Sequence, residues 1–257
     1  MNKKILESEP NPTLVTLSDN KAKWNLPEYR RKGYRDLHRI NRYGLLFRSD
    51  AVLKLKQNIN PNIEKIPLVQ KMVNHKSFCS LIVGRDQNIL FERYADDFSE
   101  FQPQTIMSIT KLFLNLFIGE LVEQKIVELD KTIGFYLPDI GSGYADASVQ
   151  DVLNMNVINS FSEDYTDPYT SSFLQESVGG WRLPDELGQN QNLEEFLNGI
   201  KAEEGKGLKN NSDLAFYKSA NTDVLGLLVE KVSGIELREW VLSVAEAIGF
   251  EDALYMA

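Results

Sequence analysis

The sequence has little cysteine and little histidine. Cys79 is its only cysteine among 257 residues, and its two histidines, His38 and His75, lie far apart. A disulfide needs two cysteines, and a zinc site needs three or four ligands at a suitable spacing. The composition therefore excludes an internal disulfide and a cysteine-based metal cluster. We expect a protein that needs no metal and no organic cofactor.

Positive charge and long apolar runs are also scarce. The 28 Lys and Arg residues face 37 Asp and Glu residues, which gives a formal net charge of −9. Nucleic-acid binding needs a basic face, so no nucleic-acid partner is expected. No run approaches the ~18 apolar residues of a membrane span. The start, Met1–Pro10, lacks the apolar core of about 7–15 residues that a secretory signal needs. We expect a cytoplasmic protein without a membrane partner.

Several common catalytic motifs are missing. The absence of a Gly-x-Ser-x-Gly elbow argues against an α/β-hydrolase. No Gly-x-x-x-x-Gly-Lys phosphate loop occurs, and Gly141-Ser-Gly143 lacks the third glycine of a dinucleotide-binding motif. A Ser-His-Asp triad would have to use His38 or His75, and nothing in the sequence points to either.

The sequence does contain a serine and a lysine at the start of an apolar segment. Ser108 and Lys111 lie within residues 104–119, whose second half is almost wholly apolar. On a helix, residues three apart lie on one face, so the lysine nitrogen can reach the serine hydroxyl. Because the segment leaves no polar side, the helix is expected to be buried. We hypothesise that Ser108 is a nucleophile and that Lys111 helps to remove its proton.

This hypothesis requires specific chemistry. A serine is a poor nucleophile until a base takes its proton, and a lysine acts as a base only when burial or nearby positive charge lowers its pKa. The helix dipole favours an alkoxide at Ser108, whose backbone N–H can donate to an oxyanion. The spacing alone is weak support, because Ser18 and Lys21 repeat it in the polar leader. A serine near a helix start is more often a cap.

The hydrophobic pattern predicts a mixed α and β structure. Two strand-like segments, 78–84 and 88–94, are joined by a link short enough for a hairpin. An antiparallel sheet therefore precedes the Ser108 helix, and a helical region follows it. Further helices are expected at 61–76, 148–155 (capped by Ser148), 193–200, 222–232 and 236–248.

Two other regions have a less specific pattern. Residues 1–60 hold many basic residues between Lys21 and Arg48, and intervening acidic residues favour a surface extension over an anion-binding arm. Residues 156–192 are loop-rich and aromatic, so they line a binding site or form a small core cluster. Trp181 is a candidate substrate contact from its position in this loop alone.

Three ordered stretches carry a family resemblance. Met107-Ser-Ile-Thr-Lys111 is similar to the Ser-x-x-Lys element of the serine β-lactamase and penicillin-binding-protein superfamily. Phe216–Gly226 resembles its second motif, in which a tyrosine precedes a helix. Residues 149–155 and 161–168 resemble the intervening stretch of the nylon-oligomer (6-aminohexanoate-dimer) hydrolases, a branch related to class C β-lactamases and esterases. The resemblance runs from about residue 60 to the end of the sequence.

The resemblance implies an α+β fold of the β-lactamase/transpeptidase type, with an antiparallel sheet, flanking helices and a helical subdomain. It implies cleavage of a small-molecule amide or ester through an acyl-enzyme on Ser108, with Lys111 and Tyr217 exchanging the proton. Tyr165 falls on a tyrosine that contacts substrate in the nylon-oligomer branch. Ser219 stands where class C enzymes usually have an asparagine and is a further candidate substrate contact.

The sequence departs from the family pattern in two places. Asn156-Val-Ile158 replaces a Thr-Ser-Gly-like turn, which implies an altered turn. The third motif, a Lys/His-Thr-Gly or Gly-Gly variant, is expected beyond residue 257 together with the second oxyanion donor, whose loss typically costs about 10²–10³ in rate. We therefore expect residues 1–60 to be an N-terminal extension and residues 61–257 to be the N-terminal two-thirds of a hydrolase domain without its C-terminal strands.

Alternative functions stay open at this point. The truncated chain could be an inactive form of the hydrolase, or a non-catalytic remnant or binding domain of the same fold. A penicillin-binding or β-lactamase activity fits less well, because the chain lacks an export signal and peptidoglycan chemistry lies outside the cytoplasm.

Overall fold

The computed structural model describes residues 21–41, 44–183 and 191–256. They fall into two compact units, one formed mainly by Ile106–Val241 and the other by Lys23–Thr105 with Leu242–Ala257. The expected division into residues 1–60 and 61–257 stays a prediction. Within the described residues, no helix combines the length and apolar character that crossing a membrane requires.

A β-hairpin is the main sheet element of the unit that begins at Lys23. Strand β3 (Ser80–Arg85) pairs antiparallel with β4 (Asn88–Tyr94), which confirms the predicted hairpin. The short strand β2 (Lys56–Gln57) adds to the other edge of β4 in parallel, giving the order β2-β4-β3. The sheet is therefore mixed, because a two-residue strand ahead of the hairpin joins it.

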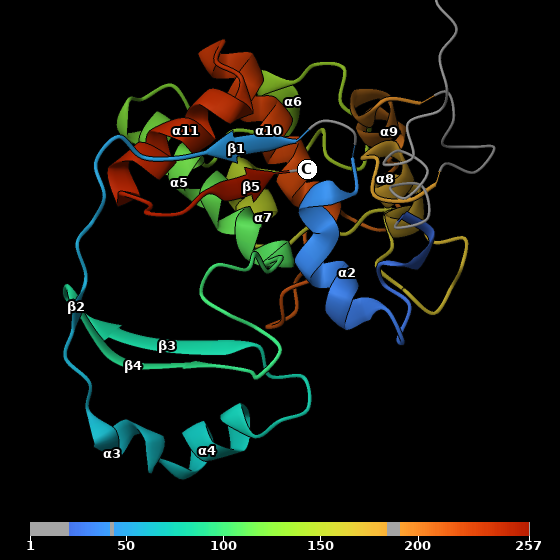
Figure 1. Ribbon diagram of the computed structural model, residues 1–257. Helices are drawn as coiled ribbons and strands as arrows, with labels where there is room; N and C mark the ends of the chain where they lie inside the picture. The colour runs from blue at the N-terminus through green and yellow to red at the C-terminus, as the bar shows by residue number, and fades with distance from the viewer. Residues whose placement is uncertain (1–20, 42–43, 184–190, 257) are drawn as a thin grey trace, which may run out of the picture. The chain divides into compact units, whose positions relative to one another are not determined.

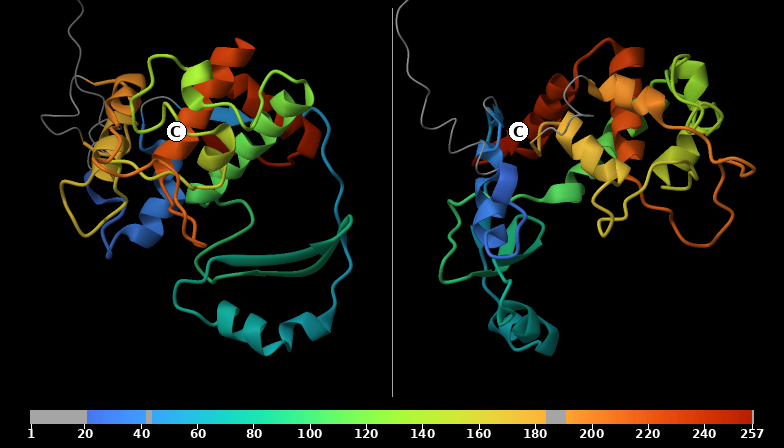
Figure 2. Two further views of the ribbon diagram at one scale, coloured as in Figure 1. Left: turned by 180° about the vertical axis from the view of Figure 1, so that it is seen from behind. Right: turned by 90° about the vertical axis from the view of Figure 1, so that its right-hand side faces the viewer.

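The helix predicted over residues 61–76 is two shorter helices. Helix α3 covers Pro61–Glu64 and α4 covers Pro67–Val73. Proline disfavours helical geometry in the residue before it, and Ile66 is extended, with φ −67° and ψ 124°. Pro67 therefore ends one helix and begins the next. Figures 1 and 2 show both helices along one side of the β3–β4 hairpin.

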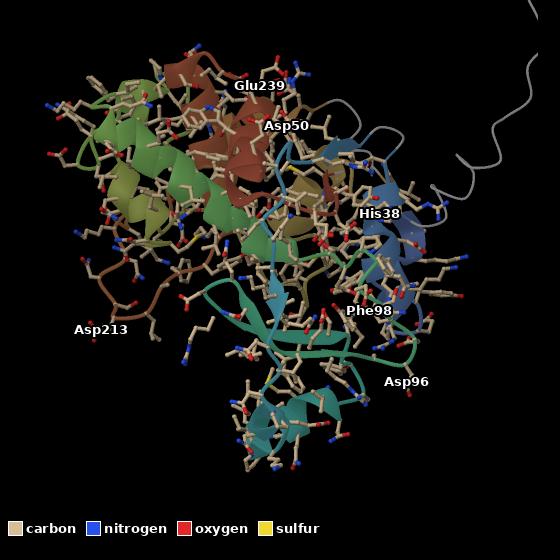
Figure 3. All side chains as sticks on the ribbon, turned by 60° about the vertical axis from the view of Figure 1, so that its left-hand side comes forward. His38, Asp50, Asp96, Phe98, Asp213 and Glu239 are labelled. Carbon is tan, nitrogen blue, oxygen red and sulfur yellow. The ribbon has the colours of Figure 1, made fainter. Side chains whose placement is uncertain are left out.

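The basic region near the start of the chain uses two of its arginines internally. Helix α2 (Arg30–Asp36) continues into a 3₁₀ helix at Leu37–Arg39. Arg31 and Arg35 both form ion pairs with Asp97. The Arg35 guanidinium lies 4.9 Å from the ring centre of Phe98, which Figure 3 labels. Two of the basic side chains are therefore paired with an acidic residue, and the surface-extension interpretation of residues 1–60 stays a prediction.

The same region reaches the last described residues of the chain. Strand β1 (Leu45–Phe47) pairs antiparallel with β5 (Leu254–Met256). The ring of His38 lies 4.8 Å from that of Tyr255. His38 therefore packs on an aromatic side chain next to this strand pair.

Helix α10 (Ser219–Ser233) is the centre of the other unit. Its buried residues are Ala220, Asn221, Val224, Leu225, Gly226, Leu228 and Val229. Among the helices that it contacts are α5 (Leu112–Glu123), α6 (Ile133–Tyr136), α7 (Val149–Leu153), α8 (Ser171–Val178) and α9 (Leu193–Gly199), and Figure 1 shows them gathered around it. Helix α11 (Leu237–Ile248) follows α10.

The end signals predicted from the sequence are present at these helices. Ser148 accepts a hydrogen bond from the backbone N–H of Asp151 and so caps α7. Gly234 ends α10 in the left-handed region, at φ 69°. The predicted helices near residues 193, 222 and 236 are confirmed as α9, α10 and α11. Helix α8 lies inside the stretch predicted as loop-rich, of which residues 184–190 lie outside the described residues.

Helix α5 is buried along one side only, so the prediction of a fully buried helix was wrong. Phe117, Ile118 and Leu121 are at most 2% exposed, but Leu112 is 60% and Leu116 58% exposed. Helix α5 packs against α10. The ring of Phe117 also lies 5.4 Å from that of Trp240, a residue of α11. The apolar composition of α5 therefore predicted more burial than the structure shows.

A buried asparagine ties α10 to its neighbours. Asn221 is fully buried; its side-chain oxygen accepts from the Tyr144 hydroxyl at 2.8 Å, and its amide donates to the Val152 carbonyl at 3.1 Å. A buried polar group without a hydrogen-bond partner destabilises the fold. Asn221 provides such a partner for the Tyr144 hydroxyl and for the Val152 carbonyl, and its own amide is paired by the same two bonds.

Replacing this asparagine tests its contribution to stability. We expect Asn221→Ala to lower the free energy of unfolding by about 2–4 kcal/mol, because the Tyr144 hydroxyl and the Val152 carbonyl lose a buried partner. Urea unfolding followed by circular dichroism measures the change. The exposed Asn211→Ala is the control and should stay within about 0.5 kcal/mol; an equal effect of both variants would contradict the prediction.

Candidate active site

Ser108 and Lys111 lie on a tight 3₁₀ turn. Met107–Lys111 is a 3₁₀ helix, η2, and α5 begins only at Leu112, so the α-helical geometry expected for the pair was wrong. The contact itself is present, because Lys111 Nζ donates to Ser108 Oγ at 3.3 Å. Residues three apart are eclipsed in a 3₁₀ helix, which brings the two side chains onto one line. Met107, directly before the serine, has a left-handed φ of 47°.

Tyr217 reaches the same serine from a distant part of the sequence. Its hydroxyl donates to Ser108 Oγ at 2.7 Å across a sequence separation of 109 residues. The segment that carries it follows the loop between α9 and α10, where Figure 3 labels Asp213. The backbone N–H of Phe216 fixes this segment by donating to the Met155 carbonyl at 2.6 Å.

Lys111 also contacts the tyrosine. Its Nζ lies 5.6 Å from the centre of the Tyr217 ring, within the range of a cation–π interaction. We call Ser108, Lys111 and Tyr217 the serine trio. The serine is exposed and Tyr217 is 46% exposed, so the hydroxyl that would react is open to small molecules.

A carboxylate from the loop after α7 holds the start of α10. Glu163 Oε1 accepts from the backbone N–H of Ser219 at 2.5 Å. The first turn of a helix has N–H groups without intrahelical partners and carries positive partial charge, so a carboxylate is stabilising there. This contact uses the backbone of Ser219, and the proposed substrate role of its side chain stays a prediction.

Tyr165 follows two residues later on the same loop. It is 55% exposed, and its ring lies 5.7 Å from that of Phe173. Desolvation raises the pKa of its hydroxyl, and the carboxylate of Glu163 raises it further. The Tyr165 hydroxyl is therefore neutral at pH 7.

Another carboxylate, that of Asp223 on α10, interacts electrostatically with Lys111. Burial raises the pKa of Asp223 to about 6, while a hydrogen bond from Gln175 and the charge of Lys111 act in the opposite direction. Glu163 raises the pKa further through like-charge repulsion. Asp223 is thus an acidic neighbour of Lys111, held by a side chain from α8.

Trp181 is the remaining aromatic candidate from the sequence. It follows α8, where its backbone N–H donates to the Glu176 carbonyl at 2.7 Å. Arg182 forms an ion pair with the side chain of the same glutamate. A substrate contact of Trp181 stays a prediction.

The sequence interpretation missed the ionisable residues behind the trio, which are Glu163, Lys218 and Asp223. Lys218 is 2% exposed, in contrast to its neighbour Tyr217. Because side chains alternate along extended backbone, a tyrosine that faces the serine implies that the next residue faces inward. That alternation was the available signal for Lys218. Glu163 and Asp223 lie within residues 161–168 and 216–226, which resemble the family, but no spacing or motif marks either residue as functional.

Comparisons with known proteins add sequence and fold relatives. No family model matches the chain. The 6-aminohexanoate-dimer hydrolase of Paenarthrobacter ureafaciens is 28% identical over 176 residues, which cover 68% of this chain and 43% of that protein. The chain therefore spans less than half the length of this curated relative.

A solved structure shows the same fold over most of the chain. It is a candidate 6-aminohexanoate-dimer hydrolase from Bacillus anthracis, with a TM-score of 0.76 and 18% sequence identity. The match covers 96% of this chain and 66% of that structure. At this identity the match establishes the fold alone.

The raised pKa of Asp223 predicts a pH-dependent stability. Between pH about 4 and 6 the folded protein holds a proton on Asp223 that the unfolded chain has lost, so its contribution to the free energy of unfolding falls as pH rises through this window. Asp223→Asn removes that fall. We expect the stability of the variant relative to wild type to increase by up to about 3 kcal/mol from pH 4 to pH 7.

Urea unfolding at pH 4, 5, 6 and 7 measures this difference. The matched control is Asp139→Asn, because Asp139 is exposed. Its stability relative to wild type should change little over the same range. A difference that is flat with pH for Asp223→Asn would show that the carboxyl has an ordinary pKa.

Proposed function

Because the chain belongs to the β-lactamase/transpeptidase-like superfamily, in the branch of the nylon-oligomer hydrolases, we propose that it is a serine hydrolase that cleaves a small-molecule amide or ester. The expected fold class is confirmed by the structural match. The observation that supports the activity most directly is the convergence of Lys111 Nζ and Tyr217 Oη on Ser108 Oγ, at 3.3 and 2.7 Å.

Ser108 is the proposed nucleophile. Its Oγ attacks the carbonyl carbon, and its proton moves to whichever member of the Lys111–Tyr217 pair is deprotonated, the neutral amine or the phenolate. Both polar atoms lie within hydrogen-bond reach of Ser108 Oγ. The same proton then passes to the leaving amine or alcohol, so that the C–N or C–O bond breaks and an acyl-enzyme remains. Water attacks the acyl group and returns a proton to Ser108 through the same pair.

The turn that carries the serine supplies further electrostatic support. The N–H groups at the start of a helix lack intrahelical partners, and the helix dipole places positive partial charge there. The backbone N–H of Ser108 is the proposed first oxyanion donor. The ammonium form of Lys111, over the ring of Tyr217, would stabilise a phenolate while the tyrosine is deprotonated.

Substrate contacts are proposed from residues that flank the trio. Ile109 is 61% and Phe216 47% exposed, and they adjoin Ser108 and Tyr217 in sequence. Exposed apolar side chains beside a nucleophile suit a hydrocarbon part of a substrate. Tyr165, whose hydroxyl is neutral at pH 7, is proposed as a polar contact, and Ser219 and Trp181 complete the proposed set.

The second candidate is a non-catalytic domain of the same fold. Among the described residues, the only strand after Tyr217 is β5, which pairs with β1. A strand that would supply a second oxyanion donor beside the trio is therefore not part of the described chain. In this alternative the chain binds a small molecule without turning it over.

A fluorophosphonate probe and a p-nitrophenyl ester separate these candidates. We expect the wild-type chain to label on Ser108, and Ser108→Ala to lose labelling and hydrolysis, because the attacking oxygen is gone. Ser80→Ala, at an exposed serine, is the control and should label like wild type. Wild-type protein that is folded but does not label would support the non-catalytic domain instead.

Removing the tyrosine hydroxyl tests the proton pathway. We expect Tyr217→Phe to lower kcat/KM for the ester by about 10²–10⁴, because a positioned acid–base group contributes by roughly this factor. Tyr169→Phe is the control, at a tyrosine that is 93% exposed. Steady-state hydrolysis measures both, and equal rates in wild type and Tyr217→Phe would exclude the tyrosine from proton transfer.

A further inference from the structure

A buried lysine stands directly behind the candidate site. Lys218 is 2% exposed, whereas lysines are almost never fully buried without a partner. It lies between Tyr217, which contacts the nucleophile, and the first residue of α10. Its backbone is extended, with φ −144° and ψ 123°, so its side chain points away from that of Tyr217. The mechanism proposed above does not use it.

The lysine satisfies two backbone carbonyls of one loop. Its Nζ donates to the Asn159 carbonyl at 3.3 Å and to the Phe161 carbonyl. It also lies 4.7 Å from the ring centre of Phe216 and 5.8 Å from that of Phe161. Loop carbonyls that are buried need such donors, because water cannot replace them.

The charged groups that face Lys218 do not form a close ion pair with it. Burial lowers its pKa to about 8, and the charges of Glu203 and Glu163 oppose that shift. A neutral amine keeps two N–H groups, which is enough for the two carbonyls. The hydrogen bonds therefore persist on deprotonation, and the donor atoms are essential to the contact even when the charge is lost.

The next residue fastens the same loop a second time. The backbone N–H of Ser219 donates to Glu163, which precedes Tyr165 by two residues on the same loop. Two adjacent residues at the start of α10 thus hold the loop at residues 159, 161 and 163. The loop's own ties to the rest of the fold include Asn159 Nδ2, which donates to the Gly143 carbonyl at 3.0 Å.

We propose that Lys218 is a positioning residue that holds residues 159–163 against the Tyr217 segment and so fixes the position of Tyr165, which follows on the same loop. The kinetic part of this proposal rests on the proposed function, whereas the structural part does not. Lys218 acts through the loop and has no contact with the reacting atoms. Its loss should affect the substrate contact made by Tyr165 more than proton transfer at Ser108.

Hydrogen exchange measures the structural part without any activity. Lys218→Met keeps the apolar stem and removes the donors. The amides of Ser160 and Ser162 are useful probes, because they donate to the Lys201 carbonyl at 2.9 Å and to Ser171 Oγ at 2.7 Å. We expect exchange in residues 157–166 to accelerate at least about tenfold while α5 is unchanged, a loss of local rather than global protection.

Two further variants make the exchange result decisive. Lys209→Met is the matched control, since Lys209 is exposed, and should exchange like wild type. If Lys218→Met does not fold, Lys218→Gln retains a donor for one carbonyl and should give an intermediate rate. Wild-type exchange in residues 157–166 of a folded Lys218 variant would overturn the proposal.

A double-mutant cycle on ester hydrolysis tests the kinetic part. We expect Lys218→Met to raise KM about tenfold, to change kcat by less than about threefold and to retain fluorophosphonate labelling of Ser108. In a Tyr165→Ala background the same change should have little further effect on KM, because coupled residues are not additive. Additive effects on KM, or a loss confined to kcat, would overturn the link to Tyr165.

These readouts separate the two proposals. Wild-type protein that never labels, together with fast loop exchange in Lys218→Met, would remove the hydrolase assignment and leave the loop contact standing. Normal labelling of wild-type protein, together with unchanged loop exchange in Lys218→Met, would keep the hydrolase assignment and remove the role of Lys218.

Discussion

The burial of the first turn of α10 is the constraint on which the candidate site depends. Lys218, Ser219 and Asn221 bring polar groups into this buried region, and each must find a partner there. Lys218 and Ser219 take theirs from the loop after α7, and Asn221 takes its own from Tyr144 and Val152. Satisfying these groups aligns the segment that carries Tyr217 with the turn that carries Ser108.

The two sides of that segment have opposite environments. Tyr217 and Ser108 are exposed to solvent, which suits the proposed role of admitting a substrate and releasing a product. On the other side lie Asp223 and Lys218, whose pKa values are shifted chiefly by burial, and Glu163, which accepts from the Ser219 N–H. Perturbed ionisable groups cluster at functional sites, because a low-dielectric surrounding strengthens every interaction between them.

Much of the fold follows from local sequence signals. The hairpin, the Ser148 cap of α7 and the Gly234 end of α10 were predicted from short-range chemistry and are present. The errors arose where a local pattern met a competing constraint. Pro67 divided a predicted helix in two, and α5, apolar on all sides, buries only the residues that reach its neighbours. An apolar sequence gives the tendency to be buried, but the partners decide which side is covered.

The sequence by itself singled out Ser108 and Lys111 by their spacing, as a candidate nucleophile and base, and Tyr217 by its resemblance to a family motif. Only the tertiary structure decided that the Tyr217 hydroxyl lies 2.7 Å from Ser108 Oγ, and that Glu163, Lys218 and Asp223 gather behind them. These residues have no shared period or motif. They meet because the loop after α7 and the start of α10 are buried against each other, and buried polar groups must be paired wherever in the chain their partners lie.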